Sequence, residues 1–234
     1  MKKQAAYGNE SISSLKGADR VRKRPAVIFG SDGIEGCEHS IFEILSNSID
    51  EAREGYGSRY EDQSVEVEDF GRGIPVDYNT KEQRFNWELL FCELYAGGKY
   101  NNDADESYEY SLGLNGLGLC STQYASEYMD VDIRRDGVQY LLHFEKGENV
   151  GGLKKESYTK KDTGTRIRWK PDLEVFTDIH VPVEYFLDII KRQAIVNDGV
   201  TFVFRNQVGN QFETTEFCYQ NGIVDHVKEI AGED

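Results

Sequence analysis

The chain has 234 residues, and its 27 Lys and Arg against 42 Asp and Glu give a formal net charge of −15 at pH 7. This length can form one large domain or two small ones with a substantial core. The charge argues against a free-standing nucleic-acid-binding protein, because neutralising phosphates requires a cationic surface. Contact with DNA would need other domains or a local basic patch, such as Arg20, Arg22, Lys23 and Arg24.

No segment has the pattern of a membrane span or a secretory signal. No apolar run approaches the roughly 20 residues that a span needs, and no basic-then-apolar signal peptide opens the chain. The four cysteines are far apart and form no Cys-x-x-Cys pair: Cys37, Cys92, Cys120 and Cys218. We therefore expect reduced thiols in a cytoplasmic protein without a zinc site.

The first elements are an arm, a short helix and a loop. Residues 1–14 are polar and aperiodic apart from Tyr7 and Ile12, so we expect them to lie outside the core. The segment from Leu15 to Arg24 predicts a short helix that Pro25 ends. Three glycines then indicate a loop: Gly30, Gly33 and Gly36.

The segment from Gly36 to Gly55 has the clearest helical pattern. At 100° per residue one broad face is apolar: Ile41, Ile44, Leu45, Ile49 and Ala52. A polar stripe follows the opposite face: His39, Glu43, Asn47 and Asp50. Periodicity alone favours a solvated helix face for this stripe.

The remaining pattern predicts an α+β protein. Residues 64–68 alternate as a strand that ends in a turn over 69–73, and helices are expected near 82–95 and from 119 to 126. Further strands are expected at 129–134, 139–145, 165–169, 200–206 and 211–217, with helices at 182–195 and 221–231. We expect a two-layer sandwich in which helices cover one face of a mixed, mostly antiparallel sheet.

Three short motifs suggest chemistry, and each has a plainer alternative. The glycine cluster from Gly113 to Gly118 precedes a predicted helix, where free backbone N–H groups could hold phosphates. It lacks the Lys-Ser/Thr of a Walker loop and the preceding strand of a dinucleotide fold, so a simple glycine-rich turn is equally compatible. Asp69 at a strand end could accept a hydrogen bond from a ring amine, or could form an Asx turn.

The third motif is the pair Glu43 and Asn47, one helical turn apart. A carboxylate there could act as a general base for a water molecule. A neutral amide oxygen one turn later could complete a Mg²⁺ shell. The alternative is the solvated helix face described above.

The order and spacing of these motifs are specific where each alone is not. The set comprises Glu43-x3-Asn47-x2-Asp50-Glu51-Ala52, Asp69-x-Gly71-x-Gly73-Ile-Pro75, Gly97-Gly-Lys99, Gly113-x2-Gly116-x-Gly118 and Thr163-Gly-Thr165. It resembles the ATP-binding set of the GHKL superfamily, and within it the ATPase domain of the bacterial type IIA DNA topoisomerases, in the B subunits of gyrase and topoisomerase IV. The resemblance covers essentially the whole chain and implies the two-layer GHKL (Bergerat) fold.

The resemblance implies a role for each matching residue. Glu43 would polarise the water that attacks the γ-phosphate of ATP, His39 would support Glu43, and Asn47 would hold Mg²⁺. Asp69 would bind the adenine amino group, and Arg72 at the rim would pair with Glu51. The residues expected to bind the nucleotide are Asn47, Asp50, Glu51, Asp69, Arg72, Gly73, Ile74, Pro75, Gly97, Gly98, Lys99, Gly113, Leu114, Asn115, Gly116, Leu117, Gly118 and Thr165.

The resemblance also implies domains and partners. Residues 1–14 would form a dimerisation arm in which Tyr7 and Ile12 reach the other protomer when ATP binds, and residues 15–220 would form the ATPase domain. Residues 221–234 would lead to a transducer domain that supplies a catalytic lysine. We expect an isolated domain that turns ATP over slowly and stays monomeric. Its implied partners are the gyrase A or topoisomerase IV A subunit, DNA through other domains, and aminocoumarin inhibitors, with no membrane partner.

The sequence departs from the family at three places. Asn115 replaces a frequent His and Leu112 a frequent Gly, and backbone phosphate contacts should tolerate both changes. The stretch from Gly57 to Ser64 looks too short for the strand that pairs with the one ending at Asp69. Either the chain lacks this edge strand or residues have been removed from it, which leaves the hairpin, though not the site, an open question.

The competing interpretation is a nucleotide-binding or regulatory module that does not hydrolyse ATP. The presence of Glu43 argues against it, because loss of the base is the simplest route to such a module. MutL proteins, heat-shock chaperones and histidine kinases are other branches of the superfamily. The Gly71-Arg-Gly-Ile-Pro-Val76 and Ala96-Gly-Gly-Lys99 segments favour the topoisomerase branch. The sequence does not separate gyrase from topoisomerase IV.

Overall fold

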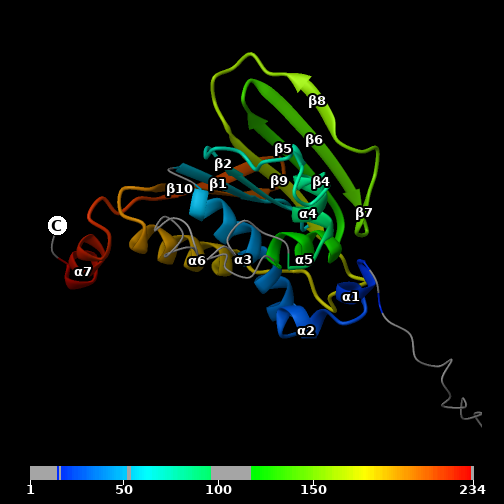
Figure 1. The fold of residues 1–234 in the computed structure, drawn as a ribbon. Helices are drawn as coiled ribbons and strands as arrows, with labels where there is room; N and C mark the ends of the chain where they lie inside the picture. Colours follow the sequence, from blue (N-terminus) through cyan, green and yellow to red (C-terminus); the bar gives the residue numbers. More distant parts are fainter. Residues whose placement is uncertain (1–14, 16, 52–53, 96–116, 233–234) are drawn as a thin grey trace, which may run out of the picture.

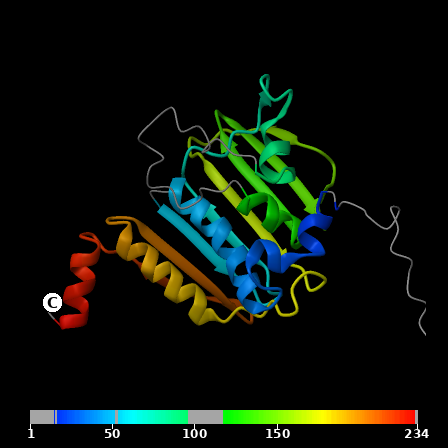
Figure 2. The same cartoon turned by 60° about the horizontal axis from the view of Figure 1, so that its bottom comes forward.

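The computed structural model describes residues 15, 17–51, 54–95 and 117–232. They form a nine-stranded sheet in the order β11-β10-β1-β2-β9-β5-β6-β7, with β8 paired to β6, and a separate two-stranded pair, β3-β4. Helices α3, α5 and α6 lie on one face of the large sheet (Figure 1). Figure 2 shows α3 and α6 running side by side across that face. The predicted two-layer α+β fold is confirmed.

The bounds of the helices follow local sequence signals. The helices are α1 (Asp19–Arg22), α2 (Pro25–Phe29), α3 (Ile34–Glu51), α4 (Asn86–Cys92), α5 (Gly118–Tyr124), α6 (Val183–Val196) and α7 (Ile223–Ala231). Pro25 begins α2, where its missing N–H and fixed φ are tolerated. Gly30 ends α2 with a left-handed φ of 79°. Helix α2 was not among the predicted elements.

The strands are mostly antiparallel neighbours. They are β1 (Glu54–Arg59), β2 (Val65–Asp69), β3 (Tyr78–Asn79), β4 (Arg84–Phe85), β5 (Ser126–Arg135), β6 (Val138–Glu145), β7 (Glu148–Asn149), β8 (Lys154–Ser157), β9 (Gly164–Pro171), β10 (Thr201–Val208) and β11 (Gln211–Phe217). Strands β1 and β10 are parallel, and every other pair in the described part of the chain is antiparallel.

The hairpin that the sequence left open is present. Strand β1 pairs antiparallel with β2, with Gly55 opposite Asp69, and it also pairs parallel with β10. It is thus an internal strand. Sequence reasoning missed it because the strand begins at Glu54, in residues assigned to the preceding helix, and because its sequence, Glu-Gly-Tyr-Gly-Ser-Arg, has no apolar alternation.

Two helix boundaries also differ from the expectation. Helix α3 ends at Glu51, earlier than Gly55, and it begins before Gly36. Gly36 is therefore not a loop residue: it is buried in the first turn, where a Cβ would overlap the carbonyl of Ser31. Helix α4 is shorter than the predicted 82–95 segment because β4 and the end of the turn before it take up the first residues of that segment.

The core lies between the sheet and the helices. Its largest fully buried side chains include Phe91, Phe144, Trp169, Phe176 and Phe204. Along β2, Val65, Val67 and Asp69 are buried, whereas Glu66 and Glu68 lie on the opposite, helix-free face. The last core-facing position of this strand is thus a carboxylate.

The structure places the cysteines and Arg22, which lies in the basic segment before α2. All four cysteines are free thiols, and burial raises the pKa of Cys37 to about 12 and of Cys92 to about 11. Arg22 donates to a carboxylate oxygen of Asp172 at 2.6 Å in a largely buried pair, so it does not belong to an open basic patch. Within the described residues, no helix is both long and apolar enough to cross a membrane.

Candidate functional site

The first half of the site is a buried carboxylate, Asp69, at the end of β2. Its Oδ1 accepts the backbone N–H of Gly71 at 3.0 Å and that of Thr165 at 3.2 Å. The hydroxyl of Ser48, on α3, is a further hydrogen-bond donor to this carboxylate. A carboxylate can accept about four hydrogen bonds, so Asp69 retains capacity for a ligand's N–H group.

The environment of Asp69 disfavours its charged form. Burial raises its pKa from 3.8 to about 6, and the nearby Glu51 carboxylate acts in the same direction. The hydrogen bonds from Gly71, Thr165 and Ser48 oppose this rise in the pKa. Asp69 is therefore mostly ionised at pH 7, and a ligand donor would relieve part of the cost of burying its charge.

Glycines let the chain turn closely beside Asp69. A Cβ on Gly71 would lie 2.6 Å from the Glu51 carbonyl oxygen, and one on Gly73 would lie 2.8 Å from the carbonyl oxygen of Arg134. Gly73 also has a φ of 77°, which favours glycine. The Thr165 hydroxyl oxygen accepts a hydrogen bond from the backbone N–H of Ile74 at 3.2 Å. The turn is thus fixed against α3, β5 and β9.

Two arginines border the glycine turn beside Asp69. Arg72 donates from Nε and Nη2 to the two carboxylate oxygens of Glu51, at 3.0 and 2.7 Å, which is the pair that we expected. The Arg72 side chain is 73% exposed, so the pair shapes the rim and contributes little to stability. Arg135 donates from Nη1 to the carbonyl of Gly73 at 2.9 Å. Pro75 is exposed beside the same turn.

The second half of the site is Glu43, in the middle of α3. The Nε2 of His39 lies 3.1 Å from Glu43 Oε1, and the Nδ1 of the same ring lies 3.2 Å from the Phe29 carbonyl oxygen. Because both ring nitrogens face oxygen atoms, the two hydrogen bonds form together when the imidazole is doubly protonated or when Glu43 carries the shared proton. His39 thereby fixes the orientation of the Glu43 carboxylate.

Gly118, the first residue of α5, lies against Glu43. A Cβ at this position would overlap Glu43 Oε2 and would also lie 2.8 Å from its carboxyl carbon. Helix α5 is held there by the Thr122 hydroxyl, which donates to the carbonyl of Ser40 at 3.0 Å. The fold therefore brings the end of the glycine cluster and the carboxylate of α3 together, as the family resemblance implied.

The other predicted residues are partly placed. Asn47 and Asp50 are half-buried on α3, and Leu117 is half-buried just before α5. The remaining predicted residues and Ala52 lie outside the described residues, so their contacts stay predictions: Tyr7, Ile12, Gly97, Gly98, Lys99, Gly113, Leu114, Asn115 and Gly116.

Sequence reasoning missed three contributors to the site. Ser48 faces Asp69, the Phe29 carbonyl holds His39, and Arg135 joins the rim. Arg135 precedes an Asp-Gly turn at the end of β5, and that turn was the only local signal near it. Ser48 and Phe29 lie in stretches with no motif that would have indicated these contacts.

The two carboxylates lie at opposite ends of one elongated site along α3. From Glu43 to Ser48, which contacts Asp69, the helix rises by about 7 Å. The Asp69 end offers a buried acceptor beside a glycine turn. The Glu43 end offers an oriented carboxylate beside a helix start. The arrangement suits a long ligand with a hydrogen-bond donor at one end and a bond open to attack by water at the other.

Comparisons with known proteins agree on one group of relatives, although no protein-family model matches the chain. The chain is 37% identical over 227 residues to the DNA gyrase B protein of Thermotoga maritima, and 34% identical over 229 residues to the DNA topoisomerase 4 B protein of Escherichia coli. Each alignment covers 95% of this chain and 35% of the relative. The chain thus spans about a third of the length of these relatives.

Solved structures with the same fold include two ATP-binding domains. The 43K ATPase domain of Thermus thermophilus gyrase B, in complex with an aminocoumarin, has a TM-score of 0.77 at 28% identity and covers 93% of this chain and 55% of that one. The ATP-binding domain of Francisella tularensis topoisomerase IV, in complex with a small-molecule inhibitor, has a TM-score of 0.74 at 30% identity. That alignment covers 92% of this chain and 58% of that one.

Proposed function

Because the chain is homologous to the ATPase domains of the bacterial type IIA topoisomerase B subunits, we propose that it binds ATP along α3 and hydrolyses it. The adenine would lie at the Asp69 end and the γ-phosphate at the Glu43 end. In the complete enzyme this ATPase would drive DNA strand passage and supercoil control.

Asp69 would recognise the adenine by accepting a hydrogen bond from its exocyclic amine. The carboxylate is already oriented by the N–H groups of Gly71 and Thr165, so Asp69 does not have to reorganise when the base enters. The glycines let the turn pack directly against Glu51 and Arg134, which fixes the backbone beside Asp69. Glu51 and Arg72 would close the rim at the edge of the base.

Glu43 would act as the general base. A water molecule beside the carboxylate would transfer its proton to Glu43 while its oxygen forms a bond to the γ-phosphorus; the bond from that phosphorus to the β–γ bridging oxygen would break and ADP would leave with that bond's electron pair. His39 would keep the carboxylate in the required orientation through the 3.1 Å contact with Oε1. Gly118 would bring the start of α5 close to the reacting group, because no side chain separates it from Glu43.

Asn47 would supply the protein ligand for Mg²⁺. It lies one turn after Glu43 and is half-buried, and its amide oxygen is a ligand type that Mg²⁺ accepts. Among the described residues, no group of three or more His, Cys, Asp or Glu side chains could hold a metal ion. In the proposed complex, phosphate oxygens and water would complete the Mg²⁺ shell beside Asn47. When bound, Mg²⁺ would neutralise charge that develops on the phosphate oxygens.

The observation that supports hydrolysis most strongly is the position of Glu43: His39 contacts its carboxylate, and Gly118 lies directly against it. The test is calorimetric titration with a non-hydrolysable ATP analogue, with and without Mg²⁺, combined with a phosphate-release assay. We expect binding with slow turnover. Binding with no turnover in this chain or in a longer chain would favour the competing module that does not hydrolyse ATP. No binding would contradict the proposal.

The partners follow from the same homology. We propose association with a gyrase A or topoisomerase IV A subunit, contact with DNA through other domains, and ATP-dependent self-association through residues 1–14. An aminocoumarin would occupy the Asp69 pocket, since the Thermus thermophilus relative is in complex with one. Sedimentation with the ATP analogue would test self-association: Tyr7→Ala and Ile12→Ala should weaken any dimer. The domain boundaries at residues 14 and 220 stay predictions.

A further inference from the structure

The helix-free face of the sheet carries a side-chain network directly behind the Asp69 pocket. Glu68 precedes Asp69 on β2 and points to this opposite face. Arg134, on β5, is opposite Gly164 of β9 in the register of the sheet. Because Gly164 has no side chain, nothing from β9 at this position separates Arg134 from β2.

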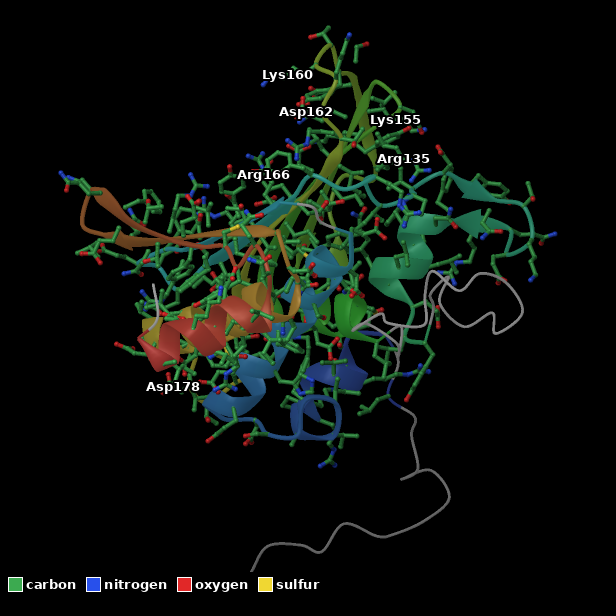
Figure 3. All side chains as sticks on the ribbon, turned by 90° about the vertical axis from the view of Figure 1, so that its left-hand side faces the viewer. Arg135, Lys155, Lys160, Asp162, Arg166 and Asp178 are labelled. Carbon is green, nitrogen blue, oxygen red and sulfur yellow. The ribbon has the colours of Figure 1, made fainter. Side chains whose placement is uncertain are left out.

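Arg134 joins β2 to the loop before β9. It is only 9% exposed, and its Nη2 lies 2.8 Å from Glu68 Oε1 while its Nη1 donates to Asp162 Oδ2 at 3.2 Å. The Tyr158 hydroxyl donates to the same Asp162 oxygen at 2.9 Å. Figure 3 shows Asp162 and Arg135 at the sheet end of the molecule, away from Asp178 on the helical side.

The loop that Arg134 holds provides direct contacts to the pocket. Thr163, next to Asp162, donates its hydroxyl to the Gly71 carbonyl at 2.6 Å. Thr165 donates its N–H to Asp69, and its hydroxyl accepts the N–H of Ile74. Thr163 belongs to the loop and Thr165 is the second residue of β9, so a displacement of the loop would move one anchor of the glycine turn and would shift the start of β9, which carries a donor to Asp69.

We propose that Arg134 is a positioning residue for the nucleotide's adenine end. It fixes Glu68 and Asp162 relative to one another, and thereby fixes Asp69 on β2 and Thr165 on β9. This inference rests on the proposed function, because it assumes that the Asp69 pocket receives the base. Arg134 acts from behind the sheet and does not contact the ligand.

The test compares Arg134→Met and Arg134→Lys with the unaltered chain. We expect Arg134→Met to weaken binding of the non-hydrolysable ATP analogue by about fivefold to tenfold. Turnover at saturating ATP should stay within about twofold, because Glu43 lies at the other end of α3. Arg134→Lys retains the charge and should restore part of the affinity. Asp162→Asn, at a more exposed partner, should give a smaller loss and should not threaten folding.

The matched control is Arg59→Met. Arg59 makes three side-chain hydrogen bonds, to Val181, Asn206 and Gln63, at the far end of the β1–β2 hairpin. We expect this variant to lower Tm and leave the affinity unchanged. If Arg134→Met and Asp162→Asn lower Tm but bind nucleotide like the unaltered chain, Arg134 is only structural and the inference is wrong. If the unaltered chain itself does not bind the ATP analogue, that result contradicts the proposed function and not the positioning role of Arg134 alone.

Discussion

The substitution Asp69→Asn distinguishes the contribution of this carboxylate to nucleotide binding from its contribution to stability. The amide oxygen can still accept the backbone N–H groups of Gly71 and Thr165 that Oδ1 accepts now. The amide nitrogen, however, presents a donor where the adenine amine requires an acceptor. Loss of a hydrogen bond to a charged group costs about 1.5–3 kcal/mol, so nucleotide affinity should fall by about 10- to 150-fold.

The same substitution should stabilise the free protein at alkaline pH. The pKa of Asp69 is about 6 in the fold against 3.8 for the ordinary group, so its ionised form destabilises the fold by about 3 kcal/mol. Because the folded pKa is the higher one, this destabilisation is absent below pH 3.8, grows as pH rises, and is complete above pH 6. Burial of the amide offsets part of the gain, so Asp69→Asn should raise Tm by a few degrees at pH 8 and by less near pH 4.

Calorimetric titration with the ATP analogue and thermal unfolding at pH 8 and pH 4 measure both effects. Asp62→Asn is the matched control, since Asp62 caps the other end of the hairpin through the backbone N–H and hydroxyl of Ser64. Its affinity should equal that of the unaltered chain. Unchanged affinity in Asp69→Asn would refute the role of Asp69 in adenine recognition. A lower Tm at pH 8 would show that the carboxylate is structural.

Three further predictions concern the same site. Glu43→Ala should bind the ATP analogue normally but release no phosphate, and loss of binding would make Glu43 structural. Gly118→Ala should abolish turnover because its Cβ overlaps Glu43 Oε2, whereas Gly57→Ala, whose Cβ would make an ordinary 3.8 Å contact, should retain turnover. Nucleotide affinity should fall as pH drops below about 6, because protonated Asp69 cannot accept as a carboxylate. Asp69→Asn should lose that component of the pH profile, and an identical profile in both proteins would contradict the assignment.

Local sequence signals predicted the parts of the site that depend on turns and helix periodicity. Glu43 and Asn47 follow from the helical stripe, and Asp69 follows from a strand that ends in glycines. Their convergence in one site was expected from the family resemblance, since no local rule relates Glu43 to Asp69. The pairing of Arg72 with Glu51 was expected in the same way.

The parts of the fold and the site that sequence reasoning missed depend on contacts between segments far apart in the chain. Strand β1 was missed because glycines remove its apolar alternation, and it is held by backbone pairing to β2 and to β10, which is about 150 residues away in the chain. Arg135 contacts the glycine turn, and Arg134 contacts Glu68 on the opposite face, because β5 lies beside β9 in the sheet. Strand order is set by the whole chain, so these neighbours could not be read from local patterns.

The most direct test of the central claim is a competition experiment. The chain is titrated with the non-hydrolysable ATP analogue in the absence and presence of novobiocin, an aminocoumarin, by calorimetry. If Asp69 is the common anchor, novobiocin should reduce the apparent affinity for nucleotide competitively, and Asp69→Asn should weaken both ligands. Nucleotide binding that novobiocin leaves unchanged, or that persists fully in Asp69→Asn, would contradict the claim that this pocket receives the adenine.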